Sequence, residues 1–188
     1  MPNHITNKIE FYGEQENINK VLDLIKGEEK FIDFEKIIPM PDNIYRGNLG
    51  YEEEKLYGKN NWYDWSIENW GTKWNAYHDN LDKANNTLTF DTAWSCPLPV
   101  LDALAELCYK HGVYFTGKWA DEDCGYNTGV FESDCDSDEY WFSFEYMENA
   151  SNDAYEIYAE LNGEHCCIGQ DENGNWVHYD CESCPHPC

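Results

Sequence analysis

The sequence has few basic residues, and none in its last third. Twelve lysines and arginines stand against 37 aspartates and glutamates, which gives a formal net charge of −25. The last basic side chain is Lys118, and residues 121–188 contain 18 acids with no lysine or arginine. Such a surface repels nucleic acids and anionic membranes and attracts basic partners or divalent cations. The charge distribution therefore argues against direct nucleic-acid or membrane binding and favours a basic protein partner.

Long apolar runs and a basic leader are also missing. No hydrophobic stretch approaches the roughly 20 residues that a membrane span requires. The amino terminus, residues 1–5, has neither the basic nor the apolar segment of a signal peptide. We therefore expect a cytoplasmic protein. Disulfides are rare in that compartment, so the nine cysteines are predicted to be free thiols or metal ligands.

The common catalytic motifs are absent as well. The sequence contains no nucleophile elbow, no glycine-rich phosphate loop and no His-Glu-x-x-His zinc motif. Pairs of carboxylates are numerous, but in so acidic a chain a pair carries little information. No general acid or base emerges, which favours a non-enzymatic protein.

The composition nevertheless supports a folded domain. Hydrophobic residues make up 41% of the 188 residues and aromatic residues 16%, enough to bury a core that offsets the conformational entropy of the chain. Alternating apolar residues predict strands, and apolar residues spaced as on one helix face predict helices. The predicted strands cover residues 5–13, 31–38, 88–94 and 113–119, and the predicted helices cover 14–26 and a segment capped by Ser95 with Pro97 in its first turn.

The order of these elements predicts an α+β fold. A β-α-β-insertion-β-α-β order is typical of the ferredoxin-like split β-α-β core, an antiparallel sheet with two helices on one face. We predict this domain at residues 1–125, with an insertion at about 42–80 of which 42–61 is a surface loop. Residues 126–188 form an acidic, cysteine-containing α+β extension packed on the same domain. In it we expect a strand at 140–146, a helix at 152–161 and a hairpin at 166–179.

Several segments within residues 1–130 occur in the same order as in a known protein family. The most specific is Asn69-Trp70-Gly71-Thr72-Lys73-Trp74, because six fixed residues with two tryptophans rarely recur by chance. Residues 34–41 and 90–97 precede and follow it. The sequence resembles the YubB-like family of plasmid- and phage-borne proteins, described as having a ferredoxin-like domain. The resemblance implies that fold and a mobile-element origin, but no activity, and the cysteine-rich tail departs from the family pattern.

An aromatic segment is the first candidate binding site. It comprises Trp62, Trp65, Trp70, Lys73 and Trp74. Such rings can form a stacking platform for a base or a peptide, with the lysine supplying a charge. The alternative is a core layer under the insertion, because aromatic stripes are usually buried.

An acidic run is the second candidate. Asp134, Asp136 and Asp138 fall at positions 1, 3 and 5 of a calcium-binding loop, and Glu145 falls at position 12. Position 6 requires glycine for a sharp turn but is occupied by Glu139. The run is therefore either a weak cation site or a solvated acidic loop.

These observations favour a non-enzymatic, mobile-element-encoded protein-binding module. Its acidic surface, mainly residues 121–188, would occupy a basic site on a host protein, for example as a nucleic-acid mimic whose carboxylates replace phosphates. One alternative is a small metal-dependent enzyme or zinc-binding protein. Another is an acidic domain whose charge only keeps it in solution.

The zinc alternative rests on the carboxyl-terminal cysteines. The four candidate ligands are Cys181, Cys184, His186 and Cys188. Three thiolates and an imidazole are a ligand set that tetrahedral zinc accepts. A second Cys-x-x-Cys pair at the usual distance is missing, so zinc is the candidate cofactor and not an established one.

The zinc hypothesis predicts one zinc ion per chain in untagged protein washed with chelator. The Cys181→Ser/Cys184→Ser variant should lose the metal, because two of its four ligands are gone. Plasma mass spectrometry measures the metal content of both proteins. Metal-free wild-type protein would contradict the hypothesis and indicate that the cysteines of the tail are free thiols.

Overall fold

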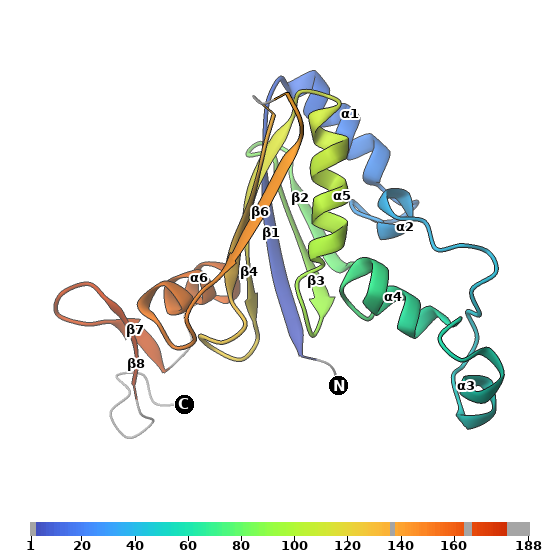
Figure 1. Cartoon of the computed structure of the whole chain (residues 1–188). Helices are drawn as coiled ribbons and strands as arrows, with labels where there is room; N and C mark the ends of the chain where they lie inside the picture. Colours follow the sequence, from blue (N-terminus) through green and yellow to red (C-terminus); the bar gives the residue numbers. More distant parts are fainter. Residues whose placement is uncertain (1–2, 136–137, 164–166, 180–188) are drawn as a thin grey trace.

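A large antiparallel sheet organises the fold (Figure 1). It has six strands in the order β2-β3-β1-β4-β5-β6. The computed structural model describes residues 3–135, 138–163 and 167–179. The strands of the large sheet are β1 (His4–Tyr12), β2 (Tyr77–Asp82), β3 (Thr87–Ala93), β4 (Tyr114–Asp121), β5 (Gly129–Asp134) and β6 (Trp141–Tyr146). A small second sheet pairs β7 (Ile168–Gln170) with β8 (Trp176–His178). The helices are α1 (Gln15–Ile25), α2 (Phe34–Ile37), α3 (Tyr51–Tyr57), α4 (Trp62–Trp70), α5 (Leu98–Tyr109) and α6 (Asn152–Asn162).

The middle strand β1 shows the predicted alternation. Ile5, Asn7, Ile9 and Phe11 are buried, whereas the residues that alternate with them, from Thr6 to Glu10, are partly exposed on the other face. Successive side chains of a strand point to opposite faces, so this pattern separates a core face from an open face. The strand pairs with β3 on one side and with β4 on the other.

Helices α1 and α5 cover the core face of the sheet (Figure 1). Each contributes a stripe of buried apolar side chains, such as Val21 on α1 and Leu104 on α5. Strands β2-β3-β1-β4 with these two helices form the ferredoxin-like arrangement, and β5 and β6 extend its sheet. This confirms the predicted α+β, ferredoxin-like fold.

Helix α6 lies on the opposite side of the sheet from α5 (Figure 1). It packs against β4 and buries a second, smaller cluster that includes Ala120, Tyr155 and Ile168. The predicted helix at 152–161, the strand at 140–146 and the hairpin at 166–179 correspond to α6, β6 and the β7-β8 pair.

The predicted strand at residues 31–38 is wrong. That segment contains the short helix α2, which begins after Asp33 because the Asp33 carboxylate accepts a hydrogen bond of 3.1 Å from the Glu35 N–H. The second strand of the core is β2, much later in the chain. The insertion therefore separates α1 from β2, and does not follow the second strand.

Two smaller expectations also need correction, and two strands were not predicted. The predicted loop at 42–61 contains α3, a helix with no buried side chain. Ser95 does not cap α5, because its hydroxyl donates a hydrogen bond to the Gly71 carbonyl and the helix begins after Pro97. Alternation of apolar residues did not predict strands β2 and β5, since neither presents a regular row of apolar residues.

The predicted domain limits stay a prediction. The predicted boundary at residue 125 lies between β4 and β5, which are neighbours in one sheet. The predicted insertion at about 42–80 contains α3 and α4 and reaches into β2. No helix among the described residues is long and apolar enough to cross a membrane.

Phe34→Ala should lower the free energy of unfolding by about 3–5 kcal/mol, because Phe34 is fully buried between the rings of Trp70 and Phe90. The matched control is Phe31→Ala, three residues earlier, whose side chain is 43% exposed. This control should cost less than about 1 kcal/mol. Urea denaturation followed by tryptophan fluorescence measures both. Equal costs would contradict the position of α2 in the core.

Candidate functional site

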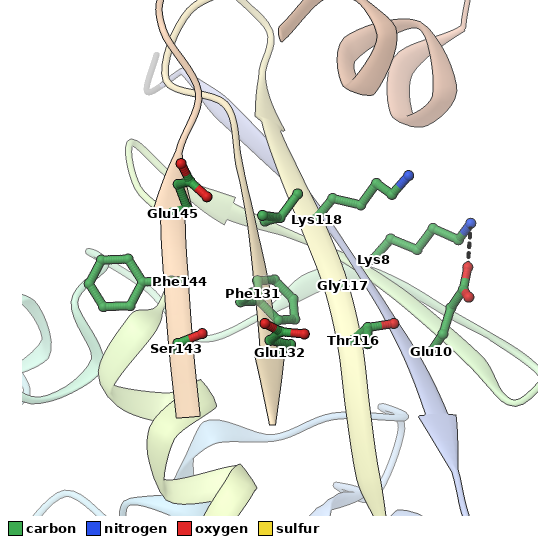
Figure 2. A pocket seen from close by; sticks show the side chains of 11 residues that line it. Lys8, Glu10, Thr116, Gly117, Lys118, Phe131, Glu132, Ser143, Phe144 and Glu145 are labelled. Carbon is green, nitrogen blue, oxygen red and sulfur yellow. Dashed lines mark ion pairs between the residues drawn. The ribbon is translucent and has the colours of Figure 1, made fainter. Parts of the chain in front are cut away.

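The open face of the sheet carries a groove of about 640 Å³ (Figure 2). Residues of β1, β4, β5 and β6 line it. Its charged groups are Lys8, Glu10 and Lys118 on one side and Glu132 and Glu145 on the other.

The strand register brings two like charges together in this groove. Lys8 on β1 lies directly opposite Lys118 on β4. Two lysines in such cross-strand positions repel each other, which destabilises the pair of strands. The carboxylate of Glu160 on α6 compensates for this repulsion because it binds both ammonium groups.

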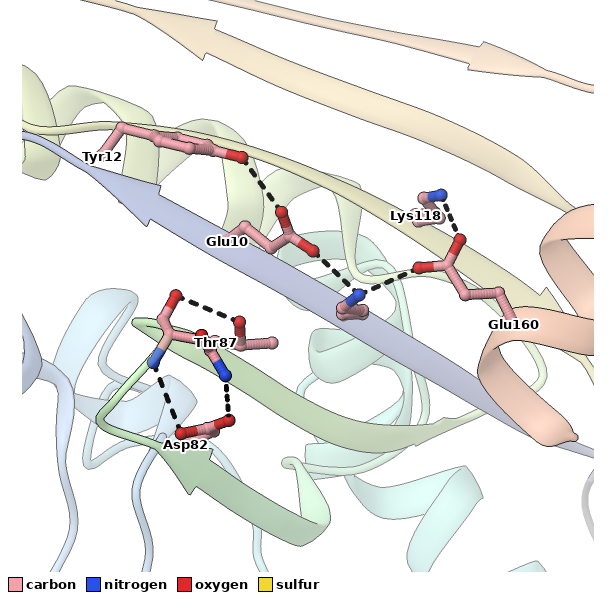
Figure 3. Close-up of polar contacts among 8 residues, drawn as sticks. Glu10, Tyr12, Asp82, Thr87, Lys118 and Glu160 are labelled. Carbon is pink, nitrogen blue, oxygen red and sulfur yellow. Dashed lines mark hydrogen bonds and ion pairs between the residues drawn. The ribbon is translucent and has the colours of Figure 1, made fainter.

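The resulting network joins three elements (Figure 3). The Lys8 Nζ lies 2.9 Å from one carboxylate oxygen of Glu160, and the Lys118 Nζ contacts the other oxygen. Lys8 also forms an ion pair of 2.8 Å with Glu10, which accepts a hydrogen bond of 3.0 Å from the Tyr12 hydroxyl. These contacts connect α6 to the middle of the large sheet.

The network shifts the pKa values of its members. Partial burial acts to lower the pKa of Lys8, but its hydrogen bonds and attraction to Glu10 and Glu160 outweigh burial and raise the pKa. Burial acts to raise the pKa of Glu160, and the bonds to Lys118 and Lys8 outweigh it and lower the pKa. The hydrogen bond from Lys8 lowers the pKa of Glu10. All three groups therefore stay charged at neutral pH.

The carboxylates across the groove are in a different position. Glu132 on β5 and Glu145 on β6 are exposed, and neither forms an ion pair with a described lysine or arginine. Since Glu10 and Glu160 already neutralise the two lysines, this wall keeps its negative charge. Exposed carboxylates of this kind attract positively charged groups.

The predicted aromatic site divides into two parts. Trp62, Trp65 and Trp70 belong to α4 and pack against the main core. The indole N–H of Trp70 donates a hydrogen bond of 2.9 Å to the Ile38 carbonyl, and that of Trp62 donates one of 3.0 Å to Gly47. Trp70 is buried in the core, and Trp62 and Trp65 are partly buried against it.

Lys73 and Trp74 lie at the surface with a partner that the sequence did not reveal. The Lys73 Nζ lies 4.6 Å from the ring centroid of Trp74 and 4.6 Å from that of Trp94, within range of a cation–π interaction. Trp94 has a φ of +71°, a strained value for an aromatic residue. The predicted strand at 88–94 included Trp94, but β3 ends at Ala93 and Trp94 is 43% exposed.

A polar cluster next to these rings also escaped the sequence patterns. The His4 Nδ1 lies 2.8 Å from the Tyr77 hydroxyl, and the His78 Nδ1 lies 2.9 Å from a carboxylate oxygen of Asp91. Burial, with the charges of Asp91 and Glu122, raises the pKa of Tyr77 to about 12. The phenol therefore stays protonated at neutral pH and does not act as a base there.

The acidic run and the tail complete the predicted sites. Asp134 ends β5, and Asp138 and Glu139 lie exposed just before β6. Trp141 lies opposite Asp134 in the sheet, and Glu145 is four residues further along β6. Four strand residues span about 13 Å, so Glu145 lies far from Asp134. Asp136 and the candidate ligands Cys181, Cys184, His186 and Cys188 lie outside the described residues. The described chain contains no group of three or more side chains arranged to hold a metal ion.

Glu160→Gln should lower the free energy of unfolding by about 0.5–1 kcal/mol at neutral pH, the range for partly exposed ion pairs. The folded-state pKa of Glu160 lies below the ordinary value of 4.5, so its stabilisation is complete above that pH and is lost as the pH falls through the folded value. The variant should therefore lose less stability on acidification than the wild type. Denaturant titrations from neutral to acidic pH measure this difference.

The matched control is Glu156→Gln, one helical turn earlier on α6. Glu156 is exposed and forms no ion pair within the described chain. This variant should follow the wild-type acid dependence. Identical acid dependence for the wild type and Glu160→Gln would show that the network does not contribute to stability.

The comparisons with known proteins concern the same part of the chain. None of the curated proteins and none of the solved structures matches it. A family model matches residues 69–161, which contain β2 to β6 together with α5 and α6. The groove-lining strands β4, β5 and β6 lie within this match, and so does Glu160, which bridges the two lysines. Over residues 69–161 the chain is similar to the ferredoxin-like domain in Api92-like protein, a description that specifies a fold and no activity.

Proposed function

We propose that the protein is a non-enzymatic binding module that presents an acidic surface to a basic site on another protein. The distribution of charge carries this proposal, because residues 121–188 have 18 acids and no lysine or arginine. Opposite charge on a partner would accelerate encounter and select against other partners.

The groove is a part of this surface where exposed carboxylates lie close together. Its two lysines are neutralised by Glu10 and Glu160, whereas Glu132 and Glu145 face solvent. A lysine or arginine of a partner can supply the charge that the chain itself lacks there. The attraction weakens as salt screens it, since the Debye length is about 10 Å at 0.1 M ionic strength.

One form of the proposal is mimicry of nucleic acid. A partner with a DNA- or RNA-binding groove carries lysines and arginines spaced to contact phosphates. Carboxylates on this chain would take the place of those phosphates, and the released counterions would favour the complex at low salt. The protein would then inhibit its partner by occupying the groove.

The setting of this function is part of the same proposal. The resemblance to YubB-like proteins supports a gene carried by a plasmid or phage, and the partner would be a host protein in the cytoplasm. Genes for plasmid transfer or phage structure beside this one would support that origin. The zinc-dependent alternative depends on Cys181, Cys184, His186 and Cys188, and the metal measurement above decides it.

A labelled peptide of alternating lysine and serine should bind the full chain and lose affinity steeply between about 50 and 200 mM salt. Glu132→Gln/Glu145→Gln should weaken binding about three- to tenfold, because two carboxylates that face the groove are removed. Fluorescence anisotropy measures the affinities.

The control is Glu28→Gln/Glu29→Gln, which removes the same charge from an exposed loop after α1. This variant should bind the peptide as the wild type does. Peptide binding that does not depend on salt, or no binding at all, would contradict the proposal. Equal weakening by both double variants would assign the binding to net charge alone and not to the groove.

A further inference from the structure

Strand β6 forms one edge of the large sheet, and it lacks the usual protection of an edge strand. Proteins guard such edges with proline, lysine, bulges or very short strands, because unpaired backbone groups recruit other chains. The strand reads Trp-Phe-Ser-Phe-Glu-Tyr, with neither proline nor lysine. Its six residues pair with β5 in an uninterrupted register. No described strand lies along its outer side.

The opposite edge of the same sheet shows the contrast. Strand β2 carries the polar side chains of His78, Asp79 and Asn80, and a register shift interrupts its pairing with β3 between Tyr77 and Asn80. A bulge of this kind twists the edge and prevents regular pairing with another strand. The chain therefore protects one edge and leaves the other open.

The backbone of β6 has its hydrogen-bonding groups directed outward at three positions. The Met147 N–H donates to the Thr128 carbonyl at 2.9 Å, and this pair comes directly after the last β5-β6 pair, Gly129 with Tyr146. Antiparallel pairs alternate between hydrogen-bonded and non-hydrogen-bonded positions. The N–H and C=O groups of Phe142, Phe144 and Tyr146 consequently point away from β5.

Two of these residues also expose aromatic rings. Phe144 is 48% exposed and Tyr146 is 54% exposed. Their ring centroids lie 6.1 Å apart, and the Tyr146 ring contacts the buried Trp119 at 5.1 Å. The row of rings thus runs from the core to the edge, where it offers apolar contacts beside the outward backbone groups.

From this geometry we infer that β6 accepts an extended basic segment of a partner protein as a seventh strand of the sheet. The inference rests on the proposed function and specifies its surface. Backbone hydrogen bonds to Phe142, Phe144 and Tyr146 supply affinity, as in other cases of strand addition. Exposed Glu145 on β6 and Glu148 beyond it supply the charge that selects lysine or arginine side chains.

A second copy of this chain is the competing occupant. If two β6 strands paired side by side, the Glu145 carboxylates of the two copies would come close together. The dimer would also join two molecules that each carry a formal net charge of −25. Like charges on neighbouring strands destabilise pairing, and a high net charge keeps molecules apart. A basic segment gains from the same charges that oppose self-association.

A peptide of alternating lysine and valine tests the inference on the full chain. Phe144→Ala and Phe144→Pro both remove the ring, but only proline removes the outward N–H. That N–H makes no bond to β5, so the proline variant should fold, which circular dichroism and thermal melting check. The proline variant should bind the peptide about fivefold more weakly than the alanine variant, the effect of one lost hydrogen bond.

Amide hydrogen exchange gives a second measurement on the unaltered protein. Peptide should slow the exchange of the Phe142, Phe144 and Tyr146 amides, whereas the Ser143 and Glu145 amides, already bonded to β5, should change little. Equal peptide affinity of both Phe144 variants, with unchanged exchange, would overturn strand addition but leave the acidic surface intact. No binding by any form would instead remove the proposed function. A dimer in analytical ultracentrifugation that Phe144→Pro abolishes would identify a second copy as the occupant and overturn the basic segment.

Discussion

The register of β1 in the middle of the sheet is the constraint on which the other features depend. This strand is hydrogen-bonded on both sides, and its alternation places Ile9 among the core side chains and Lys8 in the groove. A slip of one residue would exchange these two faces. Buried Asn7 opposes such a slip, because its side-chain amide donates to the Phe90 carbonyl at 3.3 Å and to the Thr92 hydroxyl at 3.0 Å. One amide thus helps to position both the core and the groove.

The charges of the open face follow from that register. It places Lys8 opposite Lys118. Glu160 on α6, 42 residues after Lys118, offsets the repulsion between the two lysines. The lysines are therefore used to attach α6, and they do not neutralise the acidic wall formed by Glu132 and Glu145. An acidic surface therefore remains on the open face of the sheet, and the edge strand β6 exposes the aromatic rings of Phe144 and Tyr146 on the other face.

Local patterns predicted most of the elements, and their failures have identifiable causes. The apolar residues at 31–38 suit a strand as well as a short helix, and the choice is made by Asp33, whose carboxylate caps α2 and accepts a hydrogen bond of 2.6 Å from distant Asn75. Strand β2 alternates between half-buried and exposed side chains with little apolar character, because it lies at the sheet edge. Its strand structure comes from pairing with β3, which periodicity within the segment does not reveal.

The sequence by itself determined the ferredoxin-like class and the acidic last third, because periodicity and composition are local properties. The tertiary structure alone decided that Trp62, Trp65 and Trp70 face the core, that Trp94 joins Lys73, and that Glu160 bridges two strands. It also decided which edge of the sheet stays open. These features depend on strand order and register, and the contacts that set them join residues far apart in the chain.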